Sequence, residues 1–515
     1  MKKLFILPLL IAVFVTSCSE SLLDLNNPNA LVAQNSWSTQ ADVESGLTGC
    51  YHTLYNSFYN SMNAFLISGQ SDEFYSQSPD GRLVDFVMHK YPDYDHGWNI
   101  NSWRYLYQSV FRCNQVINYA ESVDWSSDTA KTSIVAQARA IRGMSYYYLA
   151  MLWKKAPIVD WISDPADQPD EATFDELVSF IESDFQYAAS YLPESYSEVG
   201  RVNKYFAYTF LGKLYMNSGQ WANAKTAFEV VINSGKYALV ADYRDNFRHT
   251  NENNEESIFE IQNSDDNAVI NGFYGIANDN AVVSFSSYRE RFLSASPYGF
   301  GDYSVYDWVV DMYKDETDKD GNYDLRLENN VAYPGIFADF PGATIYGSTV
   351  WNTSTWSTLS WCTKYTTGYY RSSTTNWSKI NTRILRYGEL LMSYAECLIE
   401  TGGASAIAQA ATYVDMVRER SNLYPLAQSV HAATLNDLTS FKTRLRIERE
   451  KEICFEYDRF FDIRRWGLGT DESYLTEIKA RSSKYSLNWK AGREWLPIPI
   501  SDVDNNPNLT QNTGY

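Results

Sequence analysis

Apolar residues recur at three- and four-residue intervals through both the N-terminal and the C-terminal parts of the chain. In residues 102–122, for example, Trp103, Tyr107 and Val110 fall on one helical face. Residues 36–39 precede another such segment and include Ser and Thr, which commonly cap helices. The spacing therefore predicts a mainly α-helical protein. Predicted helices cover residues 41–58, 102–122, 134–153, 174–192, 382–401, 406–420 and 438–465.

Residues 204–239 are similar to one tetratricopeptide repeat, a pair of antiparallel helices. Gly212 and Ala224 are small where the two helices approach, and Tyr215 and Phe228 are large enough to fill the space between them. One repeat cannot bury its own apolar face, so neighbouring helix pairs must cover it. The pattern predicts a scaffold of stacked helix pairs.

The pattern changes between residues 241 and 380. Asn, Asp, Gly, Ser and Thr are frequent there, aromatic residues gather in 346–377, and short β-like runs such as 257–262 occur. We predict an irregular, loop-rich lobe with short β elements laid over the helical scaffold. Helices and an extended tail follow in residues 381–515.

Composition limits the function classes. The 515-residue chain has 43 Lys and Arg against 63 Asp and Glu, a net charge of −20. This balance argues against nucleic acid as a partner, because phosphate backbones are bound by clustered Lys and Arg. Aromatic residues make up 16%, including 40 Tyr and 15 Trp. Many of these rings are expected near the wet surface, where an apolar face and a polar edge are both useful.

The first residues are similar to the leader of a bacterial lipoprotein. Lys2 and Lys3 precede an apolar run at 4–15, which is shorter than the roughly 20 residues of a membrane-spanning helix and typical of a secretory signal. Small residues then lead to Cys18, as in a lipobox. This resemblance implies a signal peptide over 1–17, acylation of Cys18 and a tether over 18–35. Loss of the two lysines would change the net charge to −22.

No cofactor or metal is predicted. The sequence has no phosphate-binding Gly-rich loop with Lys, no His-Glu-x-x-His and no Gly-x-Ser-x-Gly. The cysteines beyond Cys18 are scattered, without metal-binding spacing, and are expected to be small buried apolar residues. These are Cys50, Cys113, Cys362, Cys397 and Cys454.

Four features together resemble the RagB/SusD family, SusD-like outer-membrane lipoproteins of starch and glycan utilisation. They are the lipobox; Arg-Tyr-Gly-Glu at 386–389 with Tyr-Ala-Glu at 394–396; EREKEICFEYDRFFDIRRW at 448–466; and the tail, with Leu-Pro-Ile-Pro, Asn-Pro and Gln-Asn-x-Gly-Tyr motifs. These elements extend from residue 18 to residue 515. One departure is Lys-Lys-Ala-Pro at 154–157, where the family has a Gly-containing turn.

The resemblance implies a SusD-like fold and a non-enzymatic, glycan-binding lipoprotein on the outer-membrane surface. Such proteins form a lid over a SusC-like TonB-dependent transporter and capture oligosaccharide or polysaccharide for import. The charged motif at 448–466 is expected to be structural, because opposite charges recur three and four residues apart. A catalytic carboxylate pair is the alternative reading of this motif. The charged residues that recur at these intervals are Glu448, Arg449, Glu452, Glu456, Arg459, Asp462 and Arg465.

Loops build the binding site in this family, and two segments here are loop-like, residues 69–98 and 286–361. Sugars offer apolar faces to aromatic rings and hydroxyl groups to polar side chains, so residues of both kinds are candidates. For each ring, ordinary packing in the core is the competing interpretation. The first segment, with the residue after it, supplies Trp98 with Asp72, Arg82, Tyr94, His96 and Asn99, and the second supplies Tyr298, Tyr303, Trp308, Trp351, Asn352 and Trp356.

Three other functions stay open on the sequence. A SusD-like scaffold can bind peptide in place of glycan, through a groove of backbone donors and acceptors. A surface glycoside hydrolase would need two carboxyl groups about 5–9.5 Å apart. A tetratricopeptide adaptor would bind protein on its concave helical face.

Overall fold

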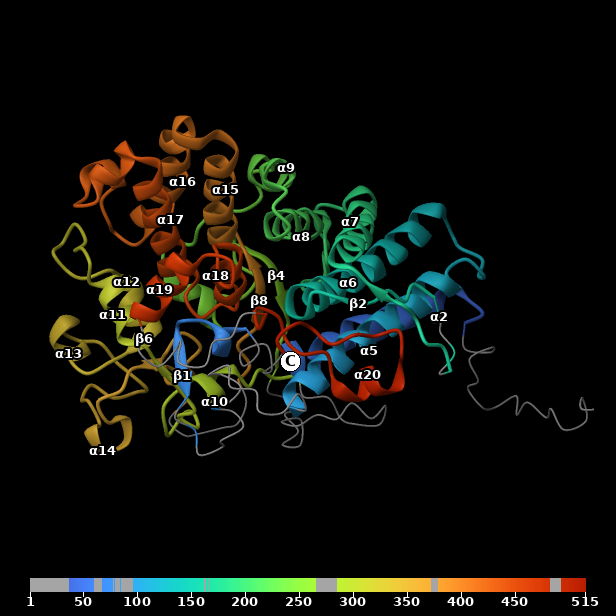
Figure 1. Ribbon diagram of the computed structural model, residues 1–515, viewed down its shortest axis with the longest axis horizontal. Coiled ribbons are helices and arrows are strands. Elements are labelled where there is room, and N and C mark those ends of the chain that lie inside the picture. The colour runs from blue at the N-terminus through green and yellow to red at the C-terminus, as the bar shows by residue number, and fades with distance from the viewer. Residues whose placement is uncertain are drawn as a thin grey trace, which may run out of the picture.

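The computed structural model describes residues 37–59, 67–76, 78, 84, 96–161, 164, 166–264, 285–371, 378–481 and 492–515. The predicted signal peptide, Cys18 and the tether lie outside these residues. Helices dominate the fold, and the sheets formed by the described residues are all two-stranded (Figure 1). Within the same residues, no helix combines the length and apolar character needed to cross a membrane.

The N-terminal helices form a continuous array (Figure 1). All of them except α9 begin after a residue whose side chain accepts from free backbone N–H groups; Thr39 and Asp42, for instance, form a reciprocal capping box. Each later helix packs on the one before it, and α2 packs on α5. The helices are α2 (Gln40–His52), α5 (Gly97–Tyr119), α6 (Asp128–Trp153), α7 (Phe174–Tyr191), α8 (Lys204–Asn217) and α9 (Trp221–Asn233).

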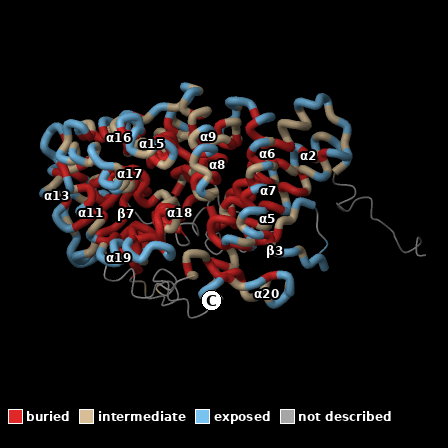
Figure 2. Tube along the Cα trace, turned by 45° about the horizontal axis from the view of Figure 1, so that its top comes forward, coloured by how far each residue is buried: buried red, intermediate tan, exposed pale blue. Residues whose placement is uncertain are grey.

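The C-terminal helices extend this array. Helix α15 (Tyr387–Gly402) packs against α9, although more than 150 residues separate them in the chain, and α16 (Ile407–Arg420) and α17 (Leu438–Ile453) pack against α15. Buried residues run through both the helical array and the irregular lobe (Figure 2) and form one apolar cluster. The predicted mainly α-helical fold class is confirmed.

The predicted repeat is the helix pair α8 and α9. Gly212 lies against the ring of Phe228, and a Cβ at position 212 would approach that ring to 2.3 Å. Phe228 is fully buried, so the ring cannot move away without disturbing its other neighbours. The small residue is therefore what allows the two helices to approach.

We expect Gly212→Ala to lower the free energy of unfolding by about 2 kcal/mol, because overpacking against Phe228 outweighs the better helix propensity of Ala. Gly49→Ala is the matched control, since it is also in a helix and its Cβ would meet no atom within 4 Å. Urea unfolding of both variants checks this. Equal stability of the two variants would contradict the packing argument.

The irregular lobe contains only short elements in its described part. Its strands pair with distant segments: β4 with β8 and β5 with β1, both antiparallel. The elements are β4 (Ser257–Ile261), α10 (Arg289–Leu293), β5 (Tyr303–Val305), α11 (Asp307–Tyr313), α12 (Leu325–Asn330), β6 (Val331–Ala332), α13 (Ile336–Asp339), α14 (Thr353–Trp356) and β7 (Trp361–Cys362). The remaining strands are β1 (Phe74–Ser76), β2 (Ala156–Pro157), β3 (Glu171–Ala172) and β8 (Thr382–Arg386).

Two predicted helices differ from the observed ones. One was predicted to begin too early, and the other is interrupted in the middle. Residues 382–386 form strand β8, not the start of a helix, because pairing with β4 decides their conformation over local propensity. The predicted helix 438–465 breaks after Ile453 and resumes as α18 (Arg459–Arg465). Phe455 and Tyr457 in the break have φ of 67° and 79°, an uncommon conformation for residues with a side chain.

The charged motif of residues 448–465 forms a buried ion-pair network. Arg386 contacts three carboxylates, with its guanidinium 2.5 Å from Glu256, 2.5 Å from Glu452 and 2.7 Å from Glu456. Burial opposes ionisation of Glu452, yet the guanidinium groups of Arg420, Arg386 and Arg326 hold its pKa well below the usual range. The motif therefore ties β8, α17 and the helix break together, as the structural interpretation predicts.

The C-terminal tail is held by its own amide side chains. Gln511 exchanges two hydrogen bonds of 2.8 Å with the backbone of Ile498. Asn512 donates to the carbonyl oxygens of Trp153 at 2.8 Å and Leu496 at 2.7 Å. The Gln-Asn motif thus pins the end of the chain against α6. All five cysteines of the described residues are buried, as the sequence predicts, and none of them forms a disulfide: Cys50, Cys113, Cys362, Cys397 and Cys454.

Candidate functional site

The two loop-like segments predicted to build the site meet in the fold. Strand β1, from the first segment, pairs with β5, from the second, with Tyr75 opposite Ser304. Strand β1, α10 and α14 lie along the lower edge of the molecule in the view of Figure 1. The candidates Arg82 and Tyr94 lie outside the described residues.

Asp72 is a structural residue and not a surface candidate. It is fully buried, and its carboxylate binds Arg459 at 2.6 Å and Arg481 at 2.8 Å. Burial alone would raise the pKa of Asp72, but the guanidinium groups of Arg459 and Arg481 hold it below its usual value. The half-buried Trp308 donates from its indole N–H to the Asp72 carbonyl oxygen at 2.6 Å. With its carboxylate consumed by two arginines, Asp72 cannot reach a ligand.

Asn99 and Tyr303 are also buried, so they too are structural residues and not surface candidates. Asn99 is fully buried, donates to the Pro497 carbonyl oxygen at 2.8 Å and accepts from the Trp153 indole at 3.0 Å. Tyr303 is fully buried, with its ring centroid 5.6 Å from that of Phe74. Polar and aromatic residues of this kind are indistinguishable in the sequence from exposed ones, because packing between distant segments decides their exposure.

His96 and Trp98 lie at the start of α5. Both are half-buried, and their ring centroids are 4.8 Å apart. The His96 ring nitrogen Nδ1 accepts from the Trp98 backbone N–H at 3.3 Å, so it caps the helix. Trp98 keeps part of its indole accessible and stays a candidate contact residue.

Four rings form what we call the aromatic shelf: Tyr298, Tyr346, Trp351 and Trp356. Successive ring centroids are 5.5 Å apart for Tyr298 and Tyr346, 5.6 Å for Tyr346 and Trp356, and 5.1 Å for Trp356 and Trp351. Tyr298 and Trp356 are only 5% and 2% exposed, so they brace the shelf from below. Trp351 is half-buried and is the ring of the four most open to solvent. Asn352 beside it is exposed.

Hydrogen bonds fix each ring of the shelf. The indole N–H of Trp356 donates to the Ser296 carbonyl oxygen at 2.9 Å, and that of Trp351 donates to the Ser357 carbonyl oxygen at 3.0 Å. The Tyr346 hydroxyl donates to the Cys362 carbonyl oxygen at 2.6 Å. Because these rings are already oriented, a ligand that packs on Trp351 would lose little side-chain entropy.

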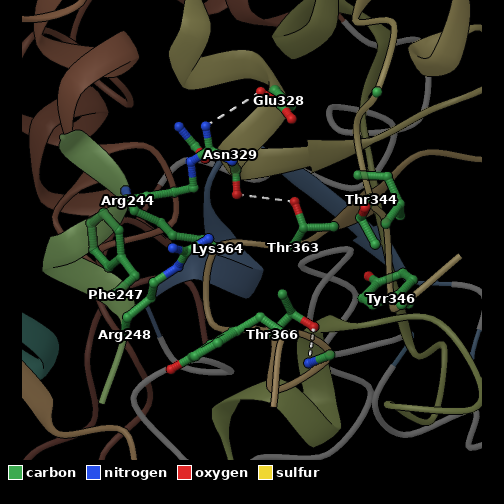
Figure 3. Close-up of a pocket in the computed structure, with 15 residues that line it drawn as sticks. Arg244, Phe247, Arg248, Glu328, Asn329, Thr344, Tyr346, Thr363, Lys364 and Thr366 are labelled. Atoms are coloured by element: carbon green, nitrogen blue, oxygen red, sulfur yellow. Dashed lines mark hydrogen bonds and ion pairs between the residues drawn. The ribbon is translucent and has the colours of Figure 1, made fainter. Parts of the chain in front are cut away.

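A polar cavity of about 240 Å³ adjoins the shelf through Tyr346 (Figure 3). Arg244, Phe247 and Arg248 lie on one side of it, and Thr344 and Tyr346 lie on the other. This cavity is not predicted from the sequence, because four separate segments of the chain build it. The sequence feature that could have indicated the cavity is a cluster of turn-forming residues. Two residues of this cluster have left-handed backbone conformations in the structure: Tyr346, with a φ of 48°, and Gly347, with a φ of 73°.

Glu290 holds the loop that lines the cavity. Its carboxylate accepts from the Thr367 backbone N–H at 2.5 Å, from the Thr367 hydroxyl at 2.7 Å and from the Thr366 hydroxyl at 3.1 Å. Burial raises the pKa of Glu290 to about 7, because the cost of desolvating the carboxylate exceeds what these hydrogen bonds return.

This pKa predicts a pH dependence of stability. The folded state prefers the protonated carboxyl, so the contribution of Glu290 falls as pH rises from its usual pKa of 4.5 to about 7. We expect Glu290→Gln to remove this slope, and the stability of the variant relative to wild type to rise by about 3 kcal/mol between these pH values. Urea unfolding at intervals of pH measures it. Parallel profiles for both proteins would show that Glu290 does not titrate there.

Comparison with known proteins assigns the chain to a family. A model described as the SusD family matches residues 232–515, more than half of the chain. The chain belongs to the SusD family. A second model, described as "starch-binding associating with outer membrane", matches residues 21–216 of this SusD-family protein.

Individual relatives agree with this assignment. A SusD-like protein, P2, of Formosa agariphila is 25% identical and covers 100% of both chains. The crystal structure of a SusD superfamily protein from Bacteroides vulgatus has a TM-score of 0.79, with 24% identity over 93% of this chain and 100% of that one. Surface glycan-binding protein A from Bacteroides thetaiotaomicron, in complex with laminarihexaose, has a TM-score of 0.70 and 22% identity over 92% of this chain and 100% of that one.

Proposed function

We propose that this SusD-family protein is a glycan-binding lipoprotein of the outer-membrane surface. It captures an oligosaccharide or polysaccharide and delivers it to a SusC-like TonB-dependent transporter, with a lipid anchor on Cys18. The observation that carries the proposal is the half-buried indole of Trp351, which packs against Trp356 at the end of the aromatic shelf, beside a polar cavity. The family description as starch-binding and associated with the outer membrane supports it.

The chemistry of the shelf suits carbohydrate. A sugar ring presents C–H groups on one face, which pack on an indole, and hydroxyl groups at its rim, which pair with amides and guanidinium groups. Trp351 supplies the first kind of contact and Asn352 the second. Trp98, His96 and Trp308 are proposed as further contacts, and Arg82 and Tyr94, which lie outside the described residues, stay proposals from the sequence.

We propose that binding is not followed by cleavage. The carboxylates that recur in the 448–465 motif are buried in ion pairs with arginine, so they offer no acid and base pair to a substrate. The protein is therefore expected to retain polysaccharide without releasing reducing ends.

Affinity electrophoresis of residues 19–515 against a panel of polysaccharides tests the proposal. We expect retardation by at least one polysaccharide and no reducing sugar after a day of incubation. Release of reducing ends would favour the hydrolase alternative. Retention of no polysaccharide, with binding of extended peptides in its place, would favour the peptide alternative.

The transporter step has a separate test. An affinity-tagged full-length chain, extracted from the native outer membrane in mild detergent, is expected to co-purify with a TonB-dependent barrel. Purification of the lipidated chain alone, under conditions that preserve other membrane complexes, would contradict the delivery step and leave the binding step intact.

A further inference from the structure

The cavity of Figure 3 concentrates positive charge in a strongly acidic protein. Three cationic side chains line it, those of Arg244, Arg248 and Lys364, against one carboxylate, that of Glu328. The whole chain carries a net charge of −20. A local excess of cations against such a background identifies the cavity as a candidate site for an anion.

The three cations differ in how far the protein already satisfies them. Lys364 already has partners within the protein, because its ammonium group donates to the Cys454 carbonyl oxygen and to Glu456, both at 2.6 Å. Arg244 forms ion pairs with Glu328 at 3.6 Å and with Asp242 at 3.8 Å. The guanidinium of Arg248 lies over the ring of Tyr369, 5.0 Å from its centroid. In the part of the chain that the structure describes, no carboxylate pairs with Arg248.

An unsatisfied acceptor lies in the same cavity. Asn329 is 9% exposed, and its amide nitrogen donates to the Leu325 carbonyl oxygen at 3.1 Å. Its amide oxygen is buried and has no hydrogen-bond partner. A buried acceptor of this kind costs stability until a donor meets it. A ligand for this cavity therefore carries a hydroxyl donor as well as an anionic group.

Size and shape restrict the ligand further. The rings of Phe247, Tyr346 and Tyr369 line the cavity and offer flat apolar walls. Its volume of about 240 Å³ lies below the roughly 300–1,000 Å³ of clefts that take drug-sized ligands, so one ring fits and a chain does not. Because Tyr346 also belongs to the aromatic shelf, a ring in the cavity lies next to a ring on the shelf.

We infer that this cavity binds a sugar ring that carries an anionic substituent, a carboxylate or a sulfate ester, within the glycan held on the shelf. Arg248, together with Arg244, holds the anion, and the amide oxygen of Asn329 accepts a hydrogen bond from a ring hydroxyl. The inference rests on the proposed glycan-binding function and names the substrate class. The negative net charge does not prevent it, because charges on the rest of the surface are screened beyond about 8 Å at physiological salt.

Matched pairs of polysaccharides test the inference by affinity electrophoresis. Polygalacturonate and alginate are each compared with their carboxyl-reduced forms, and a sulfated galactan is compared with its desulfated form. We expect at least one charged member to bind about tenfold to hundredfold more tightly than its neutral counterpart, as a charge-assisted hydrogen bond is lost. The carboxylate and sulfate arms then distinguish which anion is recognised.

Arg248→Gln is the decisive variant. It is expected to lower affinity for the charged member to about that of the neutral one. Arg104→Gln, an exposed arginine on α5, is the matched control and is expected to keep the preference. Tighter binding of every neutral member, or an unchanged preference in Arg248→Gln, overturns the inference. Binding of neutral polysaccharides alone overturns it without affecting the proposed function, whereas loss of all binding overturns both.

Discussion

Arg386→Met is expected to lower the free energy of unfolding by about 3–5 kcal/mol. The substitution keeps much of the side-chain volume but removes the cation that Glu256, Glu452 and Glu456 share. All three carboxylates would then lie close together, and Glu256 and Glu452 are fully buried. Breaking a buried pair is costly because it leaves a charge without compensation, whatever the net value of the intact pair.

Lys131→Met supplies the control for this prediction. Lys131 pairs with Glu121 at 2.7 Å, but Glu121 is 71% exposed. Loss of an exposed ion pair lowers the free energy of unfolding by only about 0–1 kcal/mol. Denaturant unfolding of the two variants under the same conditions makes the comparison. Equal stability losses would mean that the buried network does not hold β8 and α17 together in the way described.

Trp351→Ala is expected to weaken binding of the retained polysaccharide about tenfold or more, and to change the melting temperature little. The indole is the open ring of the shelf, so its removal takes away the face on which a sugar packs. It is half-buried, so the fold loses only part of a buried side chain. Affinity electrophoresis and thermal unfolding measure the two effects separately.

Two further variants make this prediction specific. Trp351→Phe keeps an aromatic face and is expected to bind with intermediate affinity. Trp161→Ala removes an indole that is 45% exposed at a position away from the shelf, and is expected to bind like wild type. Equal affinity of Trp351→Ala and Trp161→Ala would exclude the shelf as the binding surface.

The sequence predicts the helices well where one local pattern decides them. The α8 and α9 pair follows from small and large residues at repeat spacing, and the Gly212 contact with Phe228 is the contact expected. The prediction is wrong where a distant partner decides. Residues 382–386 become a strand because β4 lies beside them, and the helix after Ile453 breaks where Phe455 donates its backbone N–H to Glu73 at 2.6 Å.

The site residues are harder to predict from the sequence than the helices. Contacts between distant segments, which misled the helix predictions, also decide which side chains are exposed. Asp72 and Trp351 belong to equally polar and aromatic segments, yet Asp72 is buried between arginines and Trp351 is only half-buried. Exposure depends on packing between segments hundreds of residues apart, which spacing within one segment does not encode. The cavity that contains Arg248 and Asn329 was missed for that reason, because no two of its walls are neighbours in the chain.

A crystal structure with an oligosaccharide cut from the retained polysaccharide tests the central claim most directly. We predict one sugar ring packed on the indole of Trp351, with the adjacent ring directed toward the cavity beside Tyr346. A ligand bound elsewhere would contradict the account. The alternative to inspect is the groove of about 430 Å³ lined by Trp103, Tyr107 and Asp502, where a bound sugar would leave the aromatic shelf without its proposed function.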